Sequence, residues 1–294
     1  MTAFDGVGVA LVTPFQDGAV DFAALEKIIE FTLAGGADYL VSLGTTGEAI
    51  TLDPDECREV LHFTRDMVHG RVPLVAGLFG SNWTELLRQR LQRYALEGFD
   101  AVMSSSPAYN KPPQEGIYRH YMAAQEVSPL PIILYNVPSR TGSNMTAETI
   151  LRLAADSPKF VGVKEASGNM MQVMQILKHK PPHFRVISGD DALTLPLMAC
   201  GAVGAISVIA NALPDCFSAM VRLAANGRFA EAAIYHHRML EVHDWLYVEG
   251  NPVGIKGALE ILGHCSREVR LPLVPLSKSS LGELEAALRQ SGFC

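Results

Sequence analysis

Eight short apolar runs recur along the chain and constrain its fold more than any other feature. Each run is apolar on successive residues, which is typical of strands covered on both faces in an all-parallel sheet. Amphipathic segments with helix signals separate the runs, such as Asp53-Pro54 as cap and first turn, and the segment 82–97 before Gly98. The runs occupy residues 7–12, 39–43, 73–78, 101–104, 132–135, 160–164, 184–188 and 204–208.

Eight strand–helix units of this length predict an α/β fold, a (β/α)8 TIM barrel. Barrels of this type have about 250 residues and carry their catalytic groups at the carboxyl ends of the strands. Helical patterns continue beyond the eighth unit, so we expect a catalytic barrel over 1–225 and a C-terminal helical extension over 226–294. A doubly wound sheet is disfavoured, because neither GxGxxG after the first strand nor GxxxxGK[ST] anywhere is found.

Charge and cysteine usage narrow the class of protein. The net charge is −7 and the basic residues are scattered, which argues against nucleic acid as a partner. The five cysteines form no CxxC pair and predict reduced thiols in the cytoplasm. Residues 192–214 are uncharged and long enough to span a membrane. Pro196 and Gly201 interrupt this stretch, so we expect a buried helix, turn and strand, and no membrane partner.

Lys164 is the residue most suggestive of chemistry. It alone of the eight lysines ends an apolar strand, 160–164. Removal from water lowers a lysine's pKa, because burial disfavours the ammonium form. The neutral amine can then attack a carbonyl. The alternative is a structural ion pair with Glu165 or with a carboxylate on a neighbouring strand, and position alone does not decide between them.

Other polar residues follow the same predicted edge of the barrel. Tyr135 ends the strand before that of Lys164, and its phenol suits proton transfer, although a core aromatic is the alternative. Thr45 and Thr46 could relay a proton or cap the next helix. Arg140 could clamp a carboxylate bidentately or lie on the surface.

Two further groups have structural interpretations. Asp190 and Asp191 are expected to cap the helix that they precede. The histidines at 236, 237 and 243 lie in the helical extension, where we expect surface or packing roles. No strand-end cluster supplies three metal ligands, so the sequence predicts no metal site.

Five motifs in one order resemble the dihydrodipicolinate synthase family. The resemblance runs from Gly8 to about Leu273, and no single motif carries it alone. It implies a barrel of the superfamily that includes N-acetylneuraminate lyase, whose members are pyruvate-dependent class I aldolases. The motifs are GTTGE at 44–48, YNVPSRTG at 135–142, GVKEASG at 162–168, SGDD at 188–191 and NP at 251–252.

The resemblance implies a lyase-class condensation of pyruvate with L-aspartate 4-semialdehyde to 4-hydroxy-tetrahydrodipicolinate, the first committed step of diaminopimelate and lysine biosynthesis. Neither metal nor organic cofactor is implied. Lys164 would form the Schiff base with pyruvate. Tyr135, Thr45 and Tyr109 would relay protons, with Tyr109 reaching across from a neighbouring subunit.

The same resemblance implies the binding residues and the assembly. Thr46 would hold the pyruvate carboxylate and Arg140 that of the semialdehyde, while Gly189 and Ile206 would line the pocket through backbone groups. The protein would be a homo-oligomer, expected as a tetramer built from two dimers, with a dimer left open as the working form. The SRTG sequence around Arg140 separates the family from the sialic acid lyases.

Departures from the family pattern concern regulation. Leu78-Phe79 replaces a smaller run, and Ala108 stands where many members have a second tyrosine. We expect insensitivity to L-lysine, because the positions that would line its site lack most donors and acceptors. Those positions are Ala49, Ile50, Pro54, Cys57, Ser81, Glu85 and Ala108.

Three other functions remain open. The chain could be another pyruvate aldolase or lyase acting on a sugar acid, or a catalytically silent, ligand-binding relative. The third is a metal-dependent hydrolase, for which the strand ends offer no ligand set.

Overall fold

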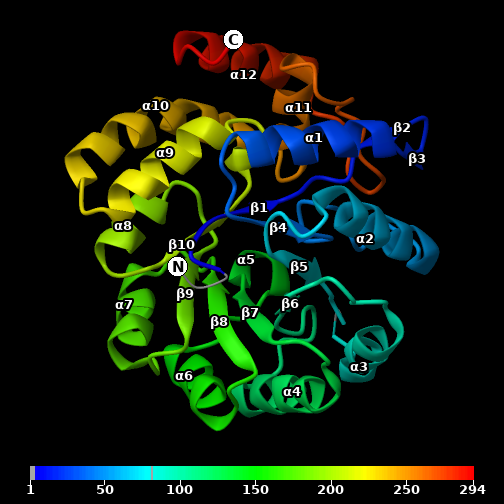
Figure 1. Cartoon of the computed structure of the whole chain (residues 1–294), viewed down its shortest axis with the longest axis vertical. Coiled ribbons are helices and arrows are strands. Elements are labelled where there is room, and N and C mark those ends of the chain that lie inside the picture. The colour runs from blue at the N-terminus through cyan, green and yellow to red at the C-terminus, as the bar shows by residue number, and fades with distance from the viewer. Residues whose placement is uncertain (1–3, 81) are drawn as a thin grey trace.

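The eight predicted strands form a closed parallel barrel (Figure 1). The computed structural model describes residues 4–80 and 82–294, so residues 1–3 and Ser81 of the predicted lysine site lie outside the described residues. Neighbours in the barrel follow chain order, and the last strand closes onto the first. The prediction of a (β/α)8 barrel is confirmed. Its strands are β1 (Gly6–Ala10), β4 (Tyr39–Ser42), β5 (Leu74–Gly77), β6 (Ala101–Ser105), β7 (Ile132–Asn136), β8 (Phe160–Glu165), β9 (Arg185–Ser188) and β10 (Gly204–Ser207).

Alternate residues of each strand fill the barrel interior. Tyr39, Met103, Ile133 and Ile206 belong to one buried interior cluster. A second cluster, between the strands and the helices, takes the residues that point outward, such as Val163. Burial on both faces explains why the strands are apolar on successive residues.

Helices surround the barrel, as Figure 1 shows. The segment 192–214 forms a helix, a turn and the strand β10, as predicted, followed by a 3-10 helix. Within the described residues, no helix is both long and apolar enough to cross a membrane. The helices are α1 (Phe22–Ala34), α2 (Pro54–Val68), α3 (Thr84–Arg93), α4 (Gln114–Val127), α5 (Pro138–Thr141), α6 (Ala147–Asp156), α7 (Met170–His179), α8 (Thr194–Ala199), η1 (Ile209–Asn211) and α9 (Pro214–Ala225). A two-stranded sheet, β2 (Phe15–Gln16) with β3 (Ala19–Val20), follows β1.

Helix boundaries follow local capping chemistry where the sequence provides it. α2 begins with a capping box, in which Asp53 accepts from the backbone of Glu56 and the Glu56 side chain accepts from Asp53 N. The predicted end of α3 before Gly98 was wrong. That helix stops at Arg93, after which Leu96 and Phe99 turn into the core.

The C-terminal extension consists of α10 (Phe229–Tyr247), α11 (Val253–Ile261) and α12 (Lys278–Gln290). α10 packs against both α9 and α12, and α12 forms the outer edge of the molecule in Figure 1. α9 ends at Ala225. We therefore propose this residue as the boundary between the catalytic barrel, 1–225, and the C-terminal helical extension, 226–294. The extension is in close contact with the barrel, which brings some of its residues to the strand ends.

Candidate active site

A cavity of about 420 Å³ opens where the strands end, and we call it the strand-end cavity. This is the face at which (β/α)8 barrels carry catalytic residues. The cavity is lined by Thr45, Thr46, Tyr135, Val137, Ser139, Arg140, Lys164, Ala166, Gly189, Asp190, Val208, His243, Tyr247 and Asn251.

Lys164 lies in this cavity beside Tyr135. The two residues are paired in register on β7 and β8, and Lys164 Nζ is 4.8 Å from the centre of the tyrosine ring. Lys164 is only 4% exposed, and the described part of the chain offers its Nζ no ion-pair or hydrogen-bond partner. A buried amine without a partner is positioned to react with a bound carbonyl.

Glu165 does not pair with its neighbour Lys164. Its carboxylate accepts hydrogen bonds from Asn136 Nδ2 at 3.0 Å, Ser167 N at 2.8 Å and Gln172 Nε2 at 3.2 Å. These donors lie outside the barrel interior because successive strand residues point to opposite faces. The structural interpretation of Lys164 as a partner of Glu165 is therefore wrong.

Thr45 and Thr46 lie in the turn after β4 and both line the strand-end cavity. Neither caps the next helix, because Asp53 caps α2. Thr46 is 2% exposed, and its Oγ1 accepts a hydrogen bond from Asn251 Nδ2 at 3.1 Å. The helix-capping alternative for the two threonines is therefore wrong.

Arg140 lines the cavity from the short helix α5. Its Nη2 donates to Asn251 O at 3.1 Å. Asn251 thus contacts both Thr46 and Arg140, the two residues expected to bind carboxylates. The sequence motif at 251–252 marked this asparagine but gave it no role.

Two residues of α10 also line the cavity: His243, for which the sequence predicted a surface or packing role, and Tyr247, which the sequence analysis did not single out. His243 and Tyr247 are one helical turn apart, and their ring centres are 4.7 Å from each other. His243 Nε2 is 4.0 Å from Asp190 Oδ1. The pKa of Tyr247 is raised by partial burial of its phenol and by the nearby carboxylates of Asp191 and Asp190. The phenol therefore remains protonated.

The two aspartates after β9 have different roles. Asp190 Oδ1 accepts from Ala192 N at 3.1 Å, just before α8, and its side chain lines the cavity. The buried Asp191 instead accepts from Val208 N at 2.9 Å and Ile209 N at 2.8 Å. Burial raises its pKa. The interpretation of Asp191 as a helix cap is wrong, since it fastens the segment after β10.

Of the remaining predicted site residues, one lines the strand-end cavity and two do not. Gly189 lines the cavity, and a Cβ there would lie 3.0 Å from Cγ of Lys164, so the glycine gives this lysine its room. Ile206 packs within the barrel interior, while Val208 lines the cavity on that side. Tyr109 lies outside the cavity of its own chain and is 86% exposed, at a φ of +73°.

The chemistry of the cavity is that of carbonyl and carboxylate groups. It brings together an amine, two phenols, two hydroxyls and a guanidinium, from Lys164, Tyr135, Tyr247, Thr45, Thr46 and Arg140. Such groups can form an imine, transfer protons and hold carboxylates. Over residues 4–80 and 82–294, no group of three or more His, Cys, Asp and Glu side chains could hold a metal ion.

Comparison with known proteins gives one consistent result. Residues 3–291 match the model of the dihydrodipicolinate synthetase family. A 4-hydroxy-tetrahydrodipicolinate synthase from Parabacteroides distasonis is 49% identical, over 97% of this chain and 96% of that protein. A monomeric dihydrodipicolinate synthase variant has a TM-score of 0.97 at 36% identity, covering 100% of this chain and 98% of the other. The lysine-bound enzyme from Cyanidioschyzon merolae has a TM-score of 0.95 at 38% identity, covering 99% of each chain.

Proposed function

Because the chain belongs to the dihydrodipicolinate synthetase family, we propose that it condenses pyruvate with L-aspartate 4-semialdehyde to 4-hydroxy-tetrahydrodipicolinate. The observation that carries this proposal is Lys164, a buried side chain that lines the strand-end cavity together with Arg140 and has no ion-pair or hydrogen-bond partner among the described residues. This would be a lyase-class, Schiff-base step in diaminopimelate and lysine biosynthesis. Its location in the cytoplasm remains a prediction.

The chemistry begins with an imine. The Lys164 amine attacks the keto carbon of pyruvate, and the carbonyl oxygen leaves as water. The imine then draws electrons from the methyl group, which loses a proton to give an enamine. The enamine carbon attacks the aldehyde carbon of the semialdehyde, and the resulting alkoxide takes up a proton. Attack by the amino group of the former semialdehyde on the imine carbon closes the ring and releases Lys164.

Each role follows from the position of a side chain. Tyr135 lies beside Lys164 and, with Thr45 and the Tyr109 of a second subunit, would transfer these protons. Thr46 would donate to the pyruvate carboxylate. Backbone groups of Gly189 and of the strand carrying Ile206 would complete the pocket wall.

Substrate profiling tests the proposal as a whole. Pyruvate consumption is measured with L-aspartate 4-semialdehyde, and cleavage is measured with N-acetylneuraminate and with 2-keto-3-deoxy sugar acids. We expect the semialdehyde to be used with the highest kcat/KM. A preference for a sugar acid would identify another pyruvate aldolase, and binding of pyruvate without turnover would identify a silent relative.

Arg140→Ala is expected to impair use of the semialdehyde selectively. Losing one charge-assisted carboxylate contact costs about 2 kcal/mol, so kcat/KM for the semialdehyde should fall about 30-fold. Imine formation with pyruvate, followed by borohydride trapping, should persist. Arg119→Ala, in an exposed ion pair on α4, is the control and should behave as wild type. Normal semialdehyde kinetics in Arg140→Ala would remove the main support for this substrate.

A homo-oligomer is part of the same proposal, and exposed apolar side chains support it. Tyr109 is 86% exposed and Ile50 is 82% exposed. Beside them is an apolar cavity of about 220 Å³, whose wall includes Ala108, Ile50 and Phe79 and which shares Thr45 and Arg140 with the strand-end cavity. Exposed apolar groups clustered near a cavity favour an interface. We propose a dimer at this face and a tetramer of two dimers.

Insensitivity to L-lysine is expected from the positions that the resemblance places around its site, of which Ala49, Ile50 and Ala108 line the apolar cavity. Pro54 has no N–H to donate, and burial raises the pKa of the Cys57 thiol, which keeps it neutral. The Glu85 carboxylate is paired with Arg88 at 3.4 Å. A lysine there would leave its charged groups unpaired, at a cost of a few kcal/mol.

The measurement is the initial rate at saturating pyruvate as L-lysine is raised to millimolar levels, and we expect no change. The Cyanidioschyzon merolae enzyme, whose structure has lysine bound, is assayed in parallel for comparison. Partial inhibition that reaches a plateau would show that an effector site exists in this protein.

A further inference from the structure

A second buried lysine, Lys256 on α11, lies outside the strand-end cavity and has no part in the chemistry above. Its side chain is 0% exposed. Lys256 Nζ donates to Glu48 Oε1 at 2.5 Å and to Glu268 O at 2.8 Å, and it lies 4.0 Å from the centre of the Phe15 ring. Burial lowers the pKa of Lys256, and the Glu48 carboxylate opposes this shift. The contact between Lys256 and Glu48 is a buried ion pair by its geometry.

Glu48 is the last residue of the turn at 44–48 that contains both threonines. Its second oxygen, Oε2, accepts from Arg270 N at 3.0 Å, so both carboxylate oxygens are bonded. Its φ is +52°, and Leu43 at the other end of the turn has a φ of +58°. Such conformations are unfavourable for residues other than glycine and persist where the surroundings hold them.

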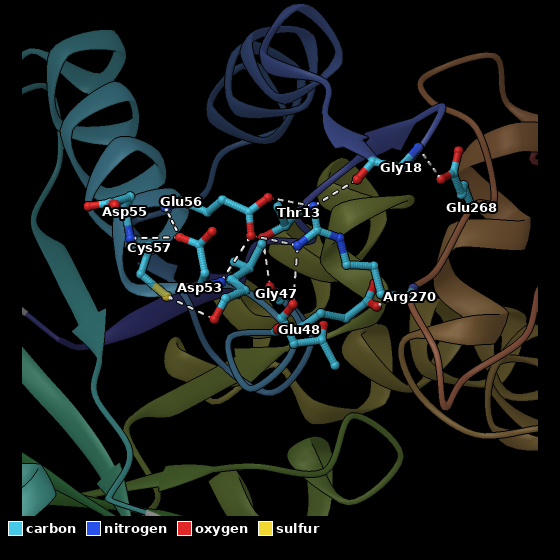
Figure 2. A network of polar contacts seen from close by, with 12 residues as sticks. Thr13, Gly18, Gly47, Glu48, Asp53, Asp55, Glu56, Cys57, Glu268 and Arg270 are labelled. Atoms are coloured by element: carbon cyan, nitrogen blue, oxygen red, sulfur yellow. Dashed lines mark hydrogen bonds and ion pairs between the residues drawn. The ribbon is translucent and has the colours of Figure 1, made fainter.

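Other contacts fasten the same turn. Thr13 Oγ1 donates to Gly47 O at 2.7 Å, and Glu48 N donates to Thr45 O at 3.1 Å. Figure 2 shows Thr13, Gly47, Glu48 and Arg270 gathered around the turn. Thr13 and Arg270, which bond Gly47 and Glu48 of the turn, do not line the strand-end cavity.

The extension holds the turn at two points. Asn251 donates to Thr46 Oγ1, and Lys256, five residues later, bonds Glu48. Replacement of a buried ion pair by apolar side chains is often neutral or stabilising, so stability alone does not explain such a pair. An ion pair can fix the geometry of a turn in the active site through directional bonds, and an apolar pair cannot form such bonds.

We propose that Glu48 and Lys256 are positioning residues that hold Thr45 and Thr46 in the orientation at which they bind the pyruvate carboxylate and transfer protons. The proposal rests on the function proposed above, because it assumes that pyruvate binds at Lys164. Neither Glu48 nor Lys256 touches the substrate. Their effect reaches it through the backbone of the turn.

Lys256→Met tests this proposal. We expect KM for pyruvate to rise about tenfold, while KM for the semialdehyde changes less than about twofold. At saturating pyruvate, the borohydride-trapped imine should still approach one per chain, which shows that the variant is folded. A merely structural role would lower the folded fraction and leave KM for pyruvate unchanged. If Lys256→Met fails to fold, Glu48→Gln is measured in the same way.

Glu260→Gln is the matched control. Glu260 lies one turn further along α11, and its ion pair with Arg267 at 3.2 Å is partly exposed and does not contact the turn. Both KM values should match those of wild type. A tenfold change in this control as well would assign the effect to general loosening of α11 and overturn the proposal.

A double-mutant cycle with Thr46→Val identifies the route. If Lys256 acts through the turn, its replacement should add less than about threefold to KM for pyruvate once the Thr46 hydroxyl is gone. Independent, multiplicative effects would overturn the proposal, as would an unchanged KM in folded Lys256→Met. Absence of any imine in wild type would instead overturn the proposed function and the inference with it.

Discussion

Replacing Lys164 by alanine is expected to lower kcat/KM by several orders of magnitude, because the change removes the covalent route and not only a contact. Borohydride reduction in the presence of pyruvate should modify wild type on Lys164 and leave Lys164→Ala unmodified. Peptide mass mapping locates the adduct. The fold should survive, since Lys164 Nζ has no partner within the described residues that its removal would leave unpaired.

Two internal controls accompany this measurement. Lys256 is also buried, but its Nζ is bonded to Glu48, so it should remain unmodified. Lys178→Ala changes an exposed lysine of α7 and should leave both activity and adduct unchanged. An adduct on a lysine other than Lys164, or turnover without any adduct, would overturn the assignment.

Tyr109→Phe is expected to lower kcat about a hundredfold, at the lower end of the range for a lost proton-transfer group. Imine formation should be slowed but still reach one per chain. Tyr118→Phe, which removes a phenol from the surface of α4, is the control and should retain full activity. Retention of full activity by Tyr109→Phe would exclude it from the relay.

Mixing variants tests whether Tyr109 acts across a subunit boundary. A mixed dimer of Tyr109→Phe and Lys164→Ala has one site with both groups intact if the tyrosine comes from the partner. Random exchange of equal amounts makes half of the dimers mixed, so about a quarter of wild-type activity should return. A mixture no more active than its components, with exchange shown by mass spectrometry, would place both groups in one chain.

The pattern of apolar strands was enough to predict the fold and the position of Tyr135 and Lys164 at the strand ends. Continuous apolar runs such as 160–164 require strands buried on both faces, and eight of them in chain order close into one barrel. Parallel pairing of the consecutive strands β7 and β8 brings their ends together, so Tyr135 beside Lys164 followed from their positions at strand ends. The residue types at those ends then indicated carbonyl chemistry.

The local sequence pattern gave the wrong role for residues whose side chains suit two structural roles. Asp191 precedes a helix and has the side chain of a cap, yet it binds the backbone after β10. Glu165 adjoins Lys164 in sequence but faces the opposite side of the sheet. Thr45 and Thr46 have side chains suited to capping, but Asp53, which the sequence also predicts as a cap, is the residue that caps α2.

The sequence by itself determined the barrel, the ends of its strands and the reactive side chains at those ends. The reason is that apolar strand patterns can be recognised in a few consecutive residues, and strands that follow each other in the chain lie side by side in the barrel. Only the tertiary structure decided what the extension contributes. Asn251 bonds Thr46 across 205 positions of the chain, and Lys256 bonds Glu48 across 208. No local periodicity encodes such contacts, since they depend on how α10 and α11 pack against the closed barrel.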